Sequence, residues 1–297
     1  MADRVRFGPA GNPLDFKGPT IEVPIYIKEE GLDAYEYQGV RGVRIKEDAA
    51  RELGKNAKEN DVYVTLHGPY YINLASDKKE TFRKSKERLL ESMRTAMWMG
   101  ARKVIFHPGY YGEKSSDEAL KMCIEALKEV VEMAKAEGIK GVLLAPETTG
   151  KPSQVGSLNE ILTMCEEVEL VCPTVDWAHI HAREQGLIKG RKEYEKILSE
   201  IEKRLGSDVL RDLHCHFTKV EFTEKGEKTH RLLSEKEFGP PFEPLAEIIV
   251  EWDLKPVIIS ESPTLDRDAI NMKKIYERIS KKMKVKPAKK VRKRKKR

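Results

Sequence analysis

Short apolar runs alternate with helix-like segments along almost the whole chain, and this alternation restricts the possible folds more than any other feature. Eight runs have the length of buried strands, and each is followed by a segment of helical periodicity or helix length. Repeated strand–helix units place parallel strands side by side, with the helices outside them. Eight such units favour a closed (β/α)8 barrel over an open doubly wound sheet. We therefore predict an α/β fold with one barrel domain over residues 1–280.

The predicted strands are mostly short and apolar, as expected for strands that are covered on both faces. They are Arg4–Phe7, Ala34–Tyr37, Val62–Leu66, Lys103–Phe106, Val142–Pro146, Val171–Val175, Val209–Leu213 and Val257–Ser260. Capping-box patterns predict helix starts at Asp77, Ser115 and Ser157. The polar insertion Phe217–Pro241, which follows the seventh predicted strand, is expected to form a hairpin or flap over the barrel mouth.

Charge is divided unevenly along the chain. Residues 281–297 hold twelve Lys or Arg and no Asp or Glu, which leaves 43 basic and 49 acidic residues elsewhere, a net charge of −6. A segment of this composition cannot bury enough apolar surface to fold alone, so we predict a disordered basic tail that contacts a phosphate-rich partner. The alternative is a tail that only keeps the protein in solution.

Other features of the composition exclude several classes of protein. The four cysteines form no C-x-x-C pair, which argues against a disulfide framework and against a zinc ribbon. The start of the chain lacks the order of residues of a signal peptide, and no apolar run approaches the roughly 18 residues of a membrane span. No glycine-rich phosphate loop follows the first predicted strand, which disfavours nucleotide binding. We expect a cytoplasmic monomer without a membrane partner.

Six of the predicted strands are followed directly by a residue that can bind a metal ion. These residues are His67, His107, Glu147, Asp176, His214 and Glu261. In parallel barrels the carboxyl ends of the strands meet at one mouth, and barrel enzymes carry their catalytic groups there. His179 follows three residues after Asp176, and the insertion adds His230. Because six incidental polar groups at one edge are improbable, we predict a metal site at this mouth.

The donor types indicate which ions would bind. Imidazole and carboxylate together suit Zn²⁺, with Mn²⁺ or Fe²⁺ as alternatives. Eight donors exceed the needs of one ion, and Glu147 has two oxygens with which to bridge a pair. Paired ions are a common device for phosphoester cleavage. We therefore expect two or three Zn²⁺ ions, or Mn²⁺ in their place.

Five short motifs resemble those of the endonuclease IV family, metal-dependent apurinic/apyrimidinic endonucleases on a xylose isomerase-like TIM barrel. The family's patterns are His-Ala-Pro-Tyr, His-Pro-Gly, Glu-Thr-Thr, Asp-x-x-His and Glu-Thr-Pro, in this order. The matching segments are His67-Gly68-Pro69-Tyr70, His107-Pro108-Gly109, Glu147-Thr148-Thr149, Asp176-Trp177-Ala178-His179 and Glu261-Ser262-Pro263. The likeness covers nearly the whole chain from the third predicted strand onward.

The resemblance implies a set of metal ligands and assigns catalysis to Glu147 and Glu261, which would orient the attacking nucleophile. The implied ligands are His67, His107, Glu147, Asp176, His179, His214 or His216, His230 and Glu261. Tyr70 matches a family residue that enters the DNA near the lesion, and its alternative role is packing beside the mouth. The tail residues expected to contact DNA are Lys289, Lys290, Arg292, Lys293 and Arg294.

Two segments depart from the family pattern. On the seventh strand the family reads His-x-Asn-Asp-x-Lys, whereas this chain has His214-Cys215-His216-Phe217-Thr218-Lys219. Aligning the lysine selects His214, but His216 lies on the same face of a strand and competes with it. In the insertion the family has Asp-x-His, whereas Lys228 stands two residues before His230 here. Candidates for the missing acidic ligand are Glu221, Glu227 and His216.

The resemblance implies a hydrolase of the deoxyribonuclease IV type, acting in base excision DNA repair. It would cleave the phosphodiester 5′ to an abasic site in damaged duplex DNA. The first alternative is a xylose isomerase-like sugar isomerase or epimerase, which usually needs one metal held by two carboxylates, an Asp and a His. That alternative leaves His67, His107 and His230 without a role. The second alternative is a nucleic-acid-binding protein that has a relaxed metal site and no catalytic activity.

Overall fold

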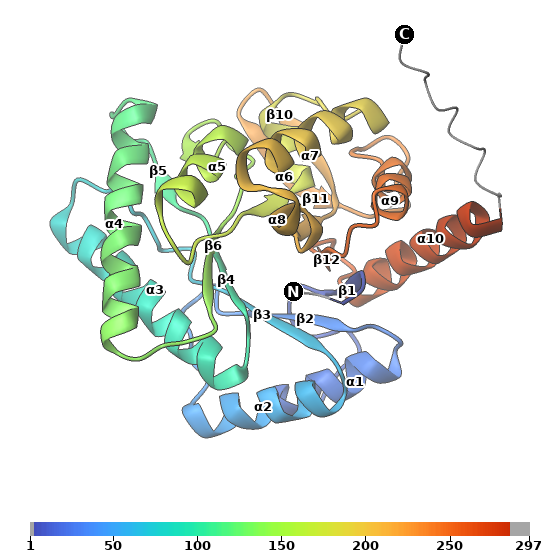
Figure 1. The fold of residues 1–297 in the computed structure, drawn as a ribbon, viewed down its shortest axis with the longest axis horizontal. Coiled ribbons are helices and arrows are strands. Elements are labelled where there is room, and N and C mark those ends of the chain that lie inside the picture. Colours follow the sequence, from blue (N-terminus) through green and yellow to red (C-terminus); the bar gives the residue numbers. More distant parts are fainter. Residues whose placement is uncertain (1–2, 286–297) are drawn as a thin grey trace, which may run out of the picture.

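Over residues 3–285, which the computed structural model describes, eight parallel strands form a closed barrel with helices around it (Figure 1). Hydrogen-bonded ladders join the strands in two sets of four, and isolated bridges at Ala10–Glu36, Leu144–Val171 and Glu147–Thr174 close the two remaining gaps. The barrel strands are β1 (Arg6–Pro9), β2 (Ala34–Gln38), β3 (Tyr63–His67), β4 (Lys103–Phe106), β6 (Leu143–Pro146), β8 (Thr174–Asp176), β9 (His214–Phe217) and β12 (Val257–Ser260). The predicted barrel is confirmed.

The helices lie outside the strands and bury one face against them. They are η1 (Thr20–Glu22), α1 (Val23–Glu29), α2 (Glu47–Glu59), α3 (Lys79–Met99), α4 (Ser116–Ala136), α5 (Leu158–Glu167), α6 (Trp177–Arg183), α7 (Arg191–Leu205), α8 (Ser207–Arg211), α9 (Phe242–Glu251) and α10 (Asp266–Val285). Ser115 and Ser157 form the predicted capping boxes. Asp77 does not cap α3, which begins after Lys78, because its carboxylate pairs with Lys114 instead.

The seventh barrel strand does not lie where the apolar pattern predicts it. The run Val209–Leu213 falls largely within α8, which begins after Gly206 with φ 88°, and the strand is β9. In β9 the side chains alternate: Phe217 packs outward on Phe242, while His214 and His216 face the barrel interior. Because two of its four residues are histidines, this strand does not have the sequence of an apolar run. As a result, His214 begins the strand and His216 lies nearer its carboxyl end.

The insertion forms the expected hairpin, built from β10 (Lys219–Thr223) and β11 (Gly226–Arg231). Its pairing is irregular, since Glu221 lies opposite Thr229 whereas Phe222 lies opposite Glu227. Lys228 is therefore the extra residue of a β-bulge. A second small sheet joins β5 (Gly109–Tyr110) and β7 (Gln154–Val155) in the loops after two barrel strands.

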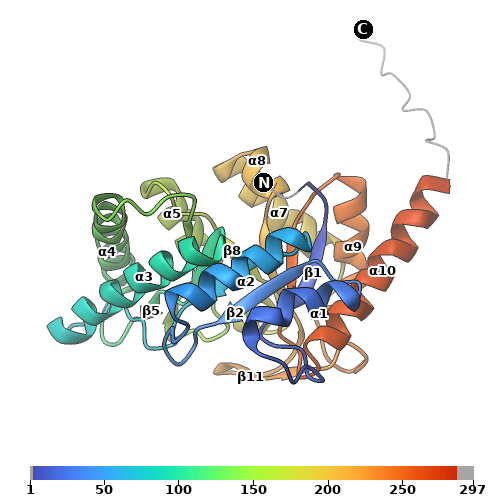
Figure 2. The same cartoon turned by 90° about the horizontal axis from the view of Figure 1, so that it is seen from below.

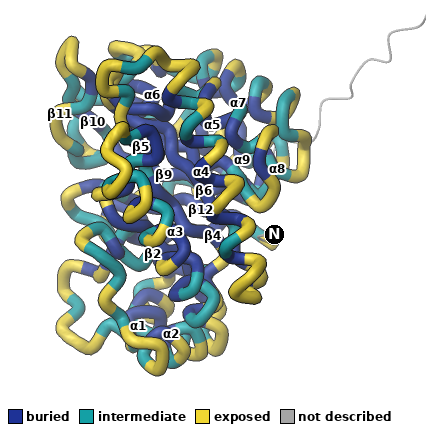
Figure 3. Tube along the Cα trace, turned by 90° about the vertical axis from the view of Figure 1, so that its left-hand side faces the viewer, coloured by how far each residue is buried: buried dark blue, intermediate teal, exposed yellow. Residues whose placement is uncertain are grey.

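The two ends of the barrel are distinct. In Figure 2 the hairpin strand β11 lies at one end, and α8 and the chain's N-terminus lie at the other. Figure 3 shows the barrel strands as largely buried and the connecting loops as the exposed part. The four cysteines are all free, as expected. Among the described residues, no helix is both long and apolar enough to cross a membrane.

Helix α10 continues through Val285, beyond the predicted domain limit at residue 280. The rest of the predicted basic tail lies outside the described residues, and so do the five tail residues expected to contact DNA. These are Lys289, Lys290, Arg292, Lys293 and Arg294.

Candidate metal centre

The structure gathers the metal-type residues at the carboxyl ends of the strands into three groups, and neighbouring groups share a carboxylate. Within each group the ligand atoms lie within 4.8 Å of one another. The groups are His67, His107 and Glu147; Glu147, Asp176, His216 and Glu261; and His179, His230 and Glu261. Because Glu147 joins the first two groups and Glu261 the last two, they form one continuous cluster.

Glu147 occupies the centre of this cluster and is fully buried. Its Oε2 lies 2.9 Å from His107 Nε2 and 3.4 Å from His67 Nε2. Its Oε1 lies 2.9 Å from His216 Nδ1. Burial alone would raise the pKa of Glu147, but the neighbouring His216 and His107 hold it well below its usual range. An ionised carboxylate with one oxygen toward each pair of donors has the arrangement of a bridging ligand.

Asp176 shows how the local fold places a ligand. It ends β8 and caps α6, where its Oδ1 accepts a hydrogen bond of 2.7 Å from the His179 backbone N–H. Its Oδ2 is left facing the cluster, 3.6 Å from His179 Nδ1 and 4.0 Å from His216 Nδ1. Burial, with the charges of Glu261 and Glu147, raises the pKa of Asp176 to about 6.

Three histidines of the cluster are oriented by backbone carbonyls. The Nδ1 atoms of His67, His179 and His230 each lie 2.8 Å from a carbonyl oxygen, those of Gly68, Thr148 and Glu261 respectively. A proton on Nδ1 satisfies each carbonyl and leaves Nε2 free as a ligand. The ring orientation of these three residues is therefore set by the chain itself.

Several buried polar atoms of the cluster make no well-aligned hydrogen bond among the described residues, although a histidine or carboxylate lies within 4.0 Å of each. They are Glu147 Oε2, Asp176 Oδ2 and His230 Nε2. Buried polar atoms without a well-aligned hydrogen bond are costly, and here they converge from different elements on one place. Histidine nitrogens and carboxylate oxygens are also the donor set that zinc and manganese accept. The residues present therefore fit a group of bound divalent ions.

His216, rather than His214, lies among the cluster residues. His216 Nδ1 is 2.9 Å from Glu147 Oε1 and 3.3 Å from Glu261 Oε1. His214 lies deeper in the barrel, and its Nε2 is 3.0 Å from Glu36 Oε2. This difference follows from the position of β9, because only the residue nearer the carboxyl end of the strand reaches the mouth.

Glu227 is the acidic residue beside the position where this chain lacks the aspartate of the family pattern. Its Oε2 is 3.2 Å from His179 Nε2, and its Oε1 is 3.3 Å from His230 Nε2. Residues three apart in a regular strand face opposite sides, but the bulge at Lys228 returns Glu227 to the face of His230. Of the other two candidates, Glu221 pairs with Lys228 and Arg231, and His216 lies by Glu147.

Glu36 is a residue of the site region that the sequence patterns miss. It lies inside β2, is fully buried, and forms a further group of possible ligands with His214 and His216. The strand-end pattern does not include it because it stands in the middle of a strand. An acidic residue between two tyrosines in a predicted buried strand is the signal that would have found it.

Tyr70 lies at the rim of the cluster. Its side chain is 54% exposed, and its ring centroid is 5.6 Å from that of His67 and 5.9 Å from that of His107. Partial burial, with the charges of Glu261 and Glu147, raises the pKa of Tyr70 to about 12. The phenol therefore keeps its proton at neutral pH, and about half of the residue is open to solvent.

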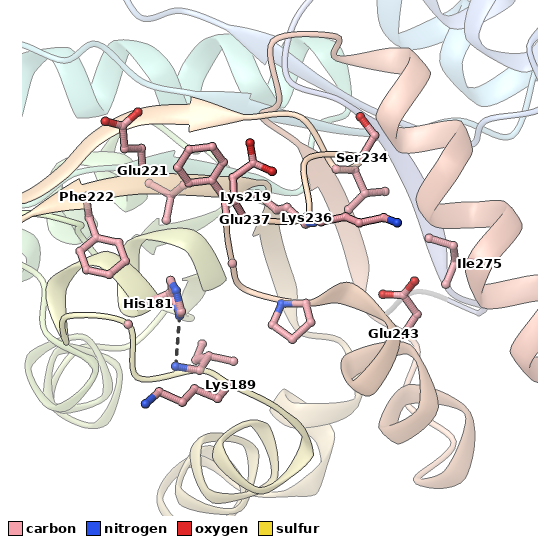
Figure 4. A pocket seen from close by; sticks show the side chains of 17 residues that line it. His181, Lys189, Lys219, Glu221, Phe222, Ser234, Lys236, Glu237, Glu243 and Ile275 are labelled. Atoms are coloured by element: carbon pink, nitrogen blue, oxygen red, sulfur yellow. Dashed lines mark hydrogen bonds between the residues drawn. The ribbon is translucent and has the colours of Figure 1, made fainter.

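His181 lies away from the cluster, consistent with its absence from the predicted ligand set. It lines a pocket of about 790 Å³ between the hairpin and the segment before α7, together with Lys189, Phe222 and other residues (Figure 4). Its Nδ1 accepts a hydrogen bond of 3.1 Å from the Ile188 backbone N–H. Burial lowers the pKa of His181 to about 4.

The sequence matches a family model over most of its length and a relative over nearly its full length. The model described as xylose isomerase-like TIM barrel matches residues 25–282. An uncharacterized protein of Methanocaldococcus jannaschii is 31% identical over 273 residues, which cover 92% of this chain and 97% of that protein. A probable endonuclease 4 of Listeria welshimeri is 28% identical over 164 residues, about half of each chain (53% and 52%).

Solved structures with the same fold include both an endonuclease and an epimerase-like protein. Endonuclease IV from Thermus thermophilus superposes with a TM-score of 0.66 at 17% identity, covering 91% of this chain and 99% of that one. A D-tagatose 3-epimerase-like protein superposes with a TM-score of 0.67 at 20% identity, covering 90% and 97%. At these identities the likeness concerns the fold alone.

Proposed function

The chain belongs to the xylose isomerase-like TIM-barrel family, and we propose that within it this protein is a metal-dependent endonuclease that cleaves DNA 5′ to abasic sites. The observation that carries the proposal is the extent of the ligand cluster. Glu147, Asp176, His216 and Glu261 already suffice for one ion, yet His67 and His107 converge on the second oxygen of Glu147. Such an excess of donors is unneeded in a single-ion enzyme and suits a phosphoesterase.

The third group of donors extends this reasoning. His179 and His230 face each other across Glu227, at the edge of the cluster nearest the hairpin. We propose that His179, His230 and Glu227 hold a third ion, with Glu227 as the acidic ligand that this chain has in place of the family's aspartate. Burial alone would raise the pKa of Glu227, but the close contacts with His179 and His230 hold it well below its usual range. A permanently ionised carboxylate suits such a role.

The chemistry would be divided among several side chains. Bound zinc or manganese ions would supply Lewis acidity toward the scissile phosphate. Glu261, which is more exposed than Glu147, would orient the attacking water and hold its proton. Tyr70 would pack against the exposed sugar or base, since its ring stands beside two cluster histidines and its phenol keeps its proton. An abasic or flipped nucleotide brings the phosphate to the mouth most easily.

A metal analysis beside a cleavage assay tests the proposal. The purified protein should contain two or three zinc or manganese ions per chain and should nick duplex DNA at an abasic site, with deaminated and intact duplexes as comparisons. Glu147→Gln should lose the metal and the activity. Glu160→Gln is the matched control, because Glu160 is also a buried carboxylate but lies outside the cluster, bonded to Tyr111 and Ser157.

Two other outcomes would contradict the proposal. A single ion per chain together with turnover of a ketose would assign the protein to the sugar epimerases, for which Glu147, Asp176, His216 and Glu261 form a complete set. DNA binding that survives Glu147→Gln, with no cleavage by either form, would indicate a nucleic-acid-binding protein without catalytic activity.

A further inference from the structure

Glu36 lies beneath the metal centre and is the most completely hydrogen-bonded carboxylate near it. Its Oε2 accepts from Thr65 Oγ1 at 3.0 Å, from His214 Nε2 at 3.0 Å and from His216 Nε2 at 3.1 Å. Its Oε1 accepts from Gln38 Nε2 at 3.2 Å. Four donors from four different residues thus converge on one fully buried carboxyl group, which is the environment of an ionised carboxylate. A buried anion is therefore fixed on the inner side of the cluster.

His216 connects this anion to the cluster through its two ring nitrogens. Nε2 faces Glu36, while Nδ1 lies 2.9 Å from Glu147 Oε1 and 3.3 Å from Glu261 Oε1. An ionised carboxylate only accepts hydrogen bonds, so the proton on Nε2 is required by Glu36. Nδ1 faces Glu147 and Glu261, two carboxylates that would themselves engage the proposed ions, so Nδ1 is the nitrogen left to bind an ion.

Three of the other cluster histidines use the opposite nitrogen. His67, His179 and His230 each place Nδ1 against a backbone carbonyl, and their Nε2 atoms face Glu147 or Glu227. His216 alone among these four residues has a charged acceptor behind it. A carboxylate that accepts the hydrogen bond of the far nitrogen raises the basicity of a ligating imidazole more than a neutral carbonyl does.

His214 supports the same arrangement without competing for the cluster. It is fully buried and lies deeper in the barrel than the cluster. Its Nε2 donates to Glu36, and its Nδ1 has no partner among residues 3–285. This second donor holds the Glu36 carboxylate in place while leaving His216 as the link to the mouth.

We propose that Glu36 is a positioning residue that fixes His216 in its Nε2–H tautomer, aims Nδ1 at the metal centre and strengthens it as a ligand. The inference rests on the proposed metal centre. It does not rest on the substrate, because an epimerase with the same ligands would use the pair in the same way. A protein that binds zinc but cuts no DNA would therefore refute the proposed function and leave this inference standing.

Zinc affinity is the first test, measured by competition with a chromophoric chelator on the full chain. Glu36→Gln keeps the size of the side chain and removes its charge, and it should weaken zinc binding about 10- to 100-fold. The number of zinc ions bound at saturation should stay at the wild-type value. Glu160→Gln, the matched loss of a buried carboxylate, should leave zinc affinity unchanged even if it lowers stability.

Nitrogen NMR of the zinc-loaded protein is the second test. His216 should carry its proton on Nε2 and zinc on Nδ1, whereas His67, His179 and His230 should show the reverse. The His216 signals are identified by their loss in His216→Gln. A proton on Nδ1 of His216, or equal zinc affinity in Glu36→Gln and wild type, would refute the proposal. A zinc count lower by one in Glu36→Gln would also refute it, since Glu36 would then be a ligand. Wild-type protein that binds neither zinc nor manganese would overturn both proposals.

Discussion

Glu227 reaches His179 and His230 only because Lys228 bulges out of the hairpin. Removal of the Glu227 charge should therefore weaken metal binding at the His179–His230 end of the cluster and leave metal binding around Glu147 unchanged. We expect Glu227→Gln to weaken binding of the zinc at the His179–His230 end about tenfold or more, while the ions around Glu147 stay bound. Zinc titration with metal analysis measures this. Lys228→Gln is the control, and equal zinc binding by the two variants would exclude Glu227 as a ligand.

His181 should make the free energy of unfolding depend measurably on pH in the acid range. Its pKa is about 4 in the folded state and about 6.5 when unfolded, so between these values the unfolded chain binds more protons. The free energy of unfolding should therefore fall as the pH drops from 6.5 to 4, by at most about 3 kcal/mol from this residue. Protonation would also break the Ile188 N–H bond to Nδ1.

Denaturant unfolding of metal-free protein at several pH values measures this effect. His181→Gln should be less sensitive to acid than the wild type over the same range, because glutamine does not titrate. Identical pH profiles for the two proteins would show that His181 is not buried in its neutral form.

At the scale of elements, β1 and β2 approach so closely that only glycine fits at position 8. A Cβ on Gly8 would lie 1.7 Å from the backbone oxygen of Ala34, which no side-chain rotation relieves. We expect Gly8→Ala to destabilise the protein by on the order of 3 kcal/mol or more. Gly190→Ala, which meets no atom within 4 Å, should cost no more than about 1 kcal/mol. Denaturant unfolding compares them, and similar losses would contradict the proposed close contact.

Most elements were predictable because the physical cause of each lies within its own segment. Apolar strands such as Lys103–Phe106 and the capping boxes at Ser115 and Ser157 are local patterns, and the structure has them where they were predicted. β9 was misplaced because its inward side chains are histidines that serve the site rather than the core. Its position depends on pairing with β8 and β12, which no local pattern shows.

The residues of the candidate site likewise differ in whether a local pattern or a long-range contact sets their position. Strand-end residues such as His67, Glu147 and Asp176 were found because a barrel brings the ends of its strands together. The place of Glu227 depends on a bulge, and that of Glu36 on contacts across the barrel interior with residues about 180 positions away. Contacts of this kind are set by the closed barrel, so a motif of adjacent residues does not reveal them.

At the scale of the whole molecule, the basic tail should affect DNA affinity rather than the chemical step. Residues 286–297 hold nine Lys or Arg. A chain that ends at Val285 should bind duplex DNA more weakly, with a shallower dependence of the binding constant on salt, by up to about 0.9 in the logarithmic slope for each lost phosphate contact. Its zinc content and its kcat on abasic duplex should match those of the full chain. A fall in kcat at an unchanged KM would show that the tail acts at the mouth.

The direction of α10 determines what such a tail can do. Lys273, in the middle of the helix, already contacts Gly31 and Asp33, which precede β2 at the end of the barrel opposite the mouth. The remaining turns carry the helix away from the barrel in Figures 1 and 2, through about 18 Å at 1.5 Å per residue. Twelve further residues span about 40 Å at most. The tail would thus work as a tether, holding a second stretch of the same duplex and raising the local concentration of lesions near the mouth.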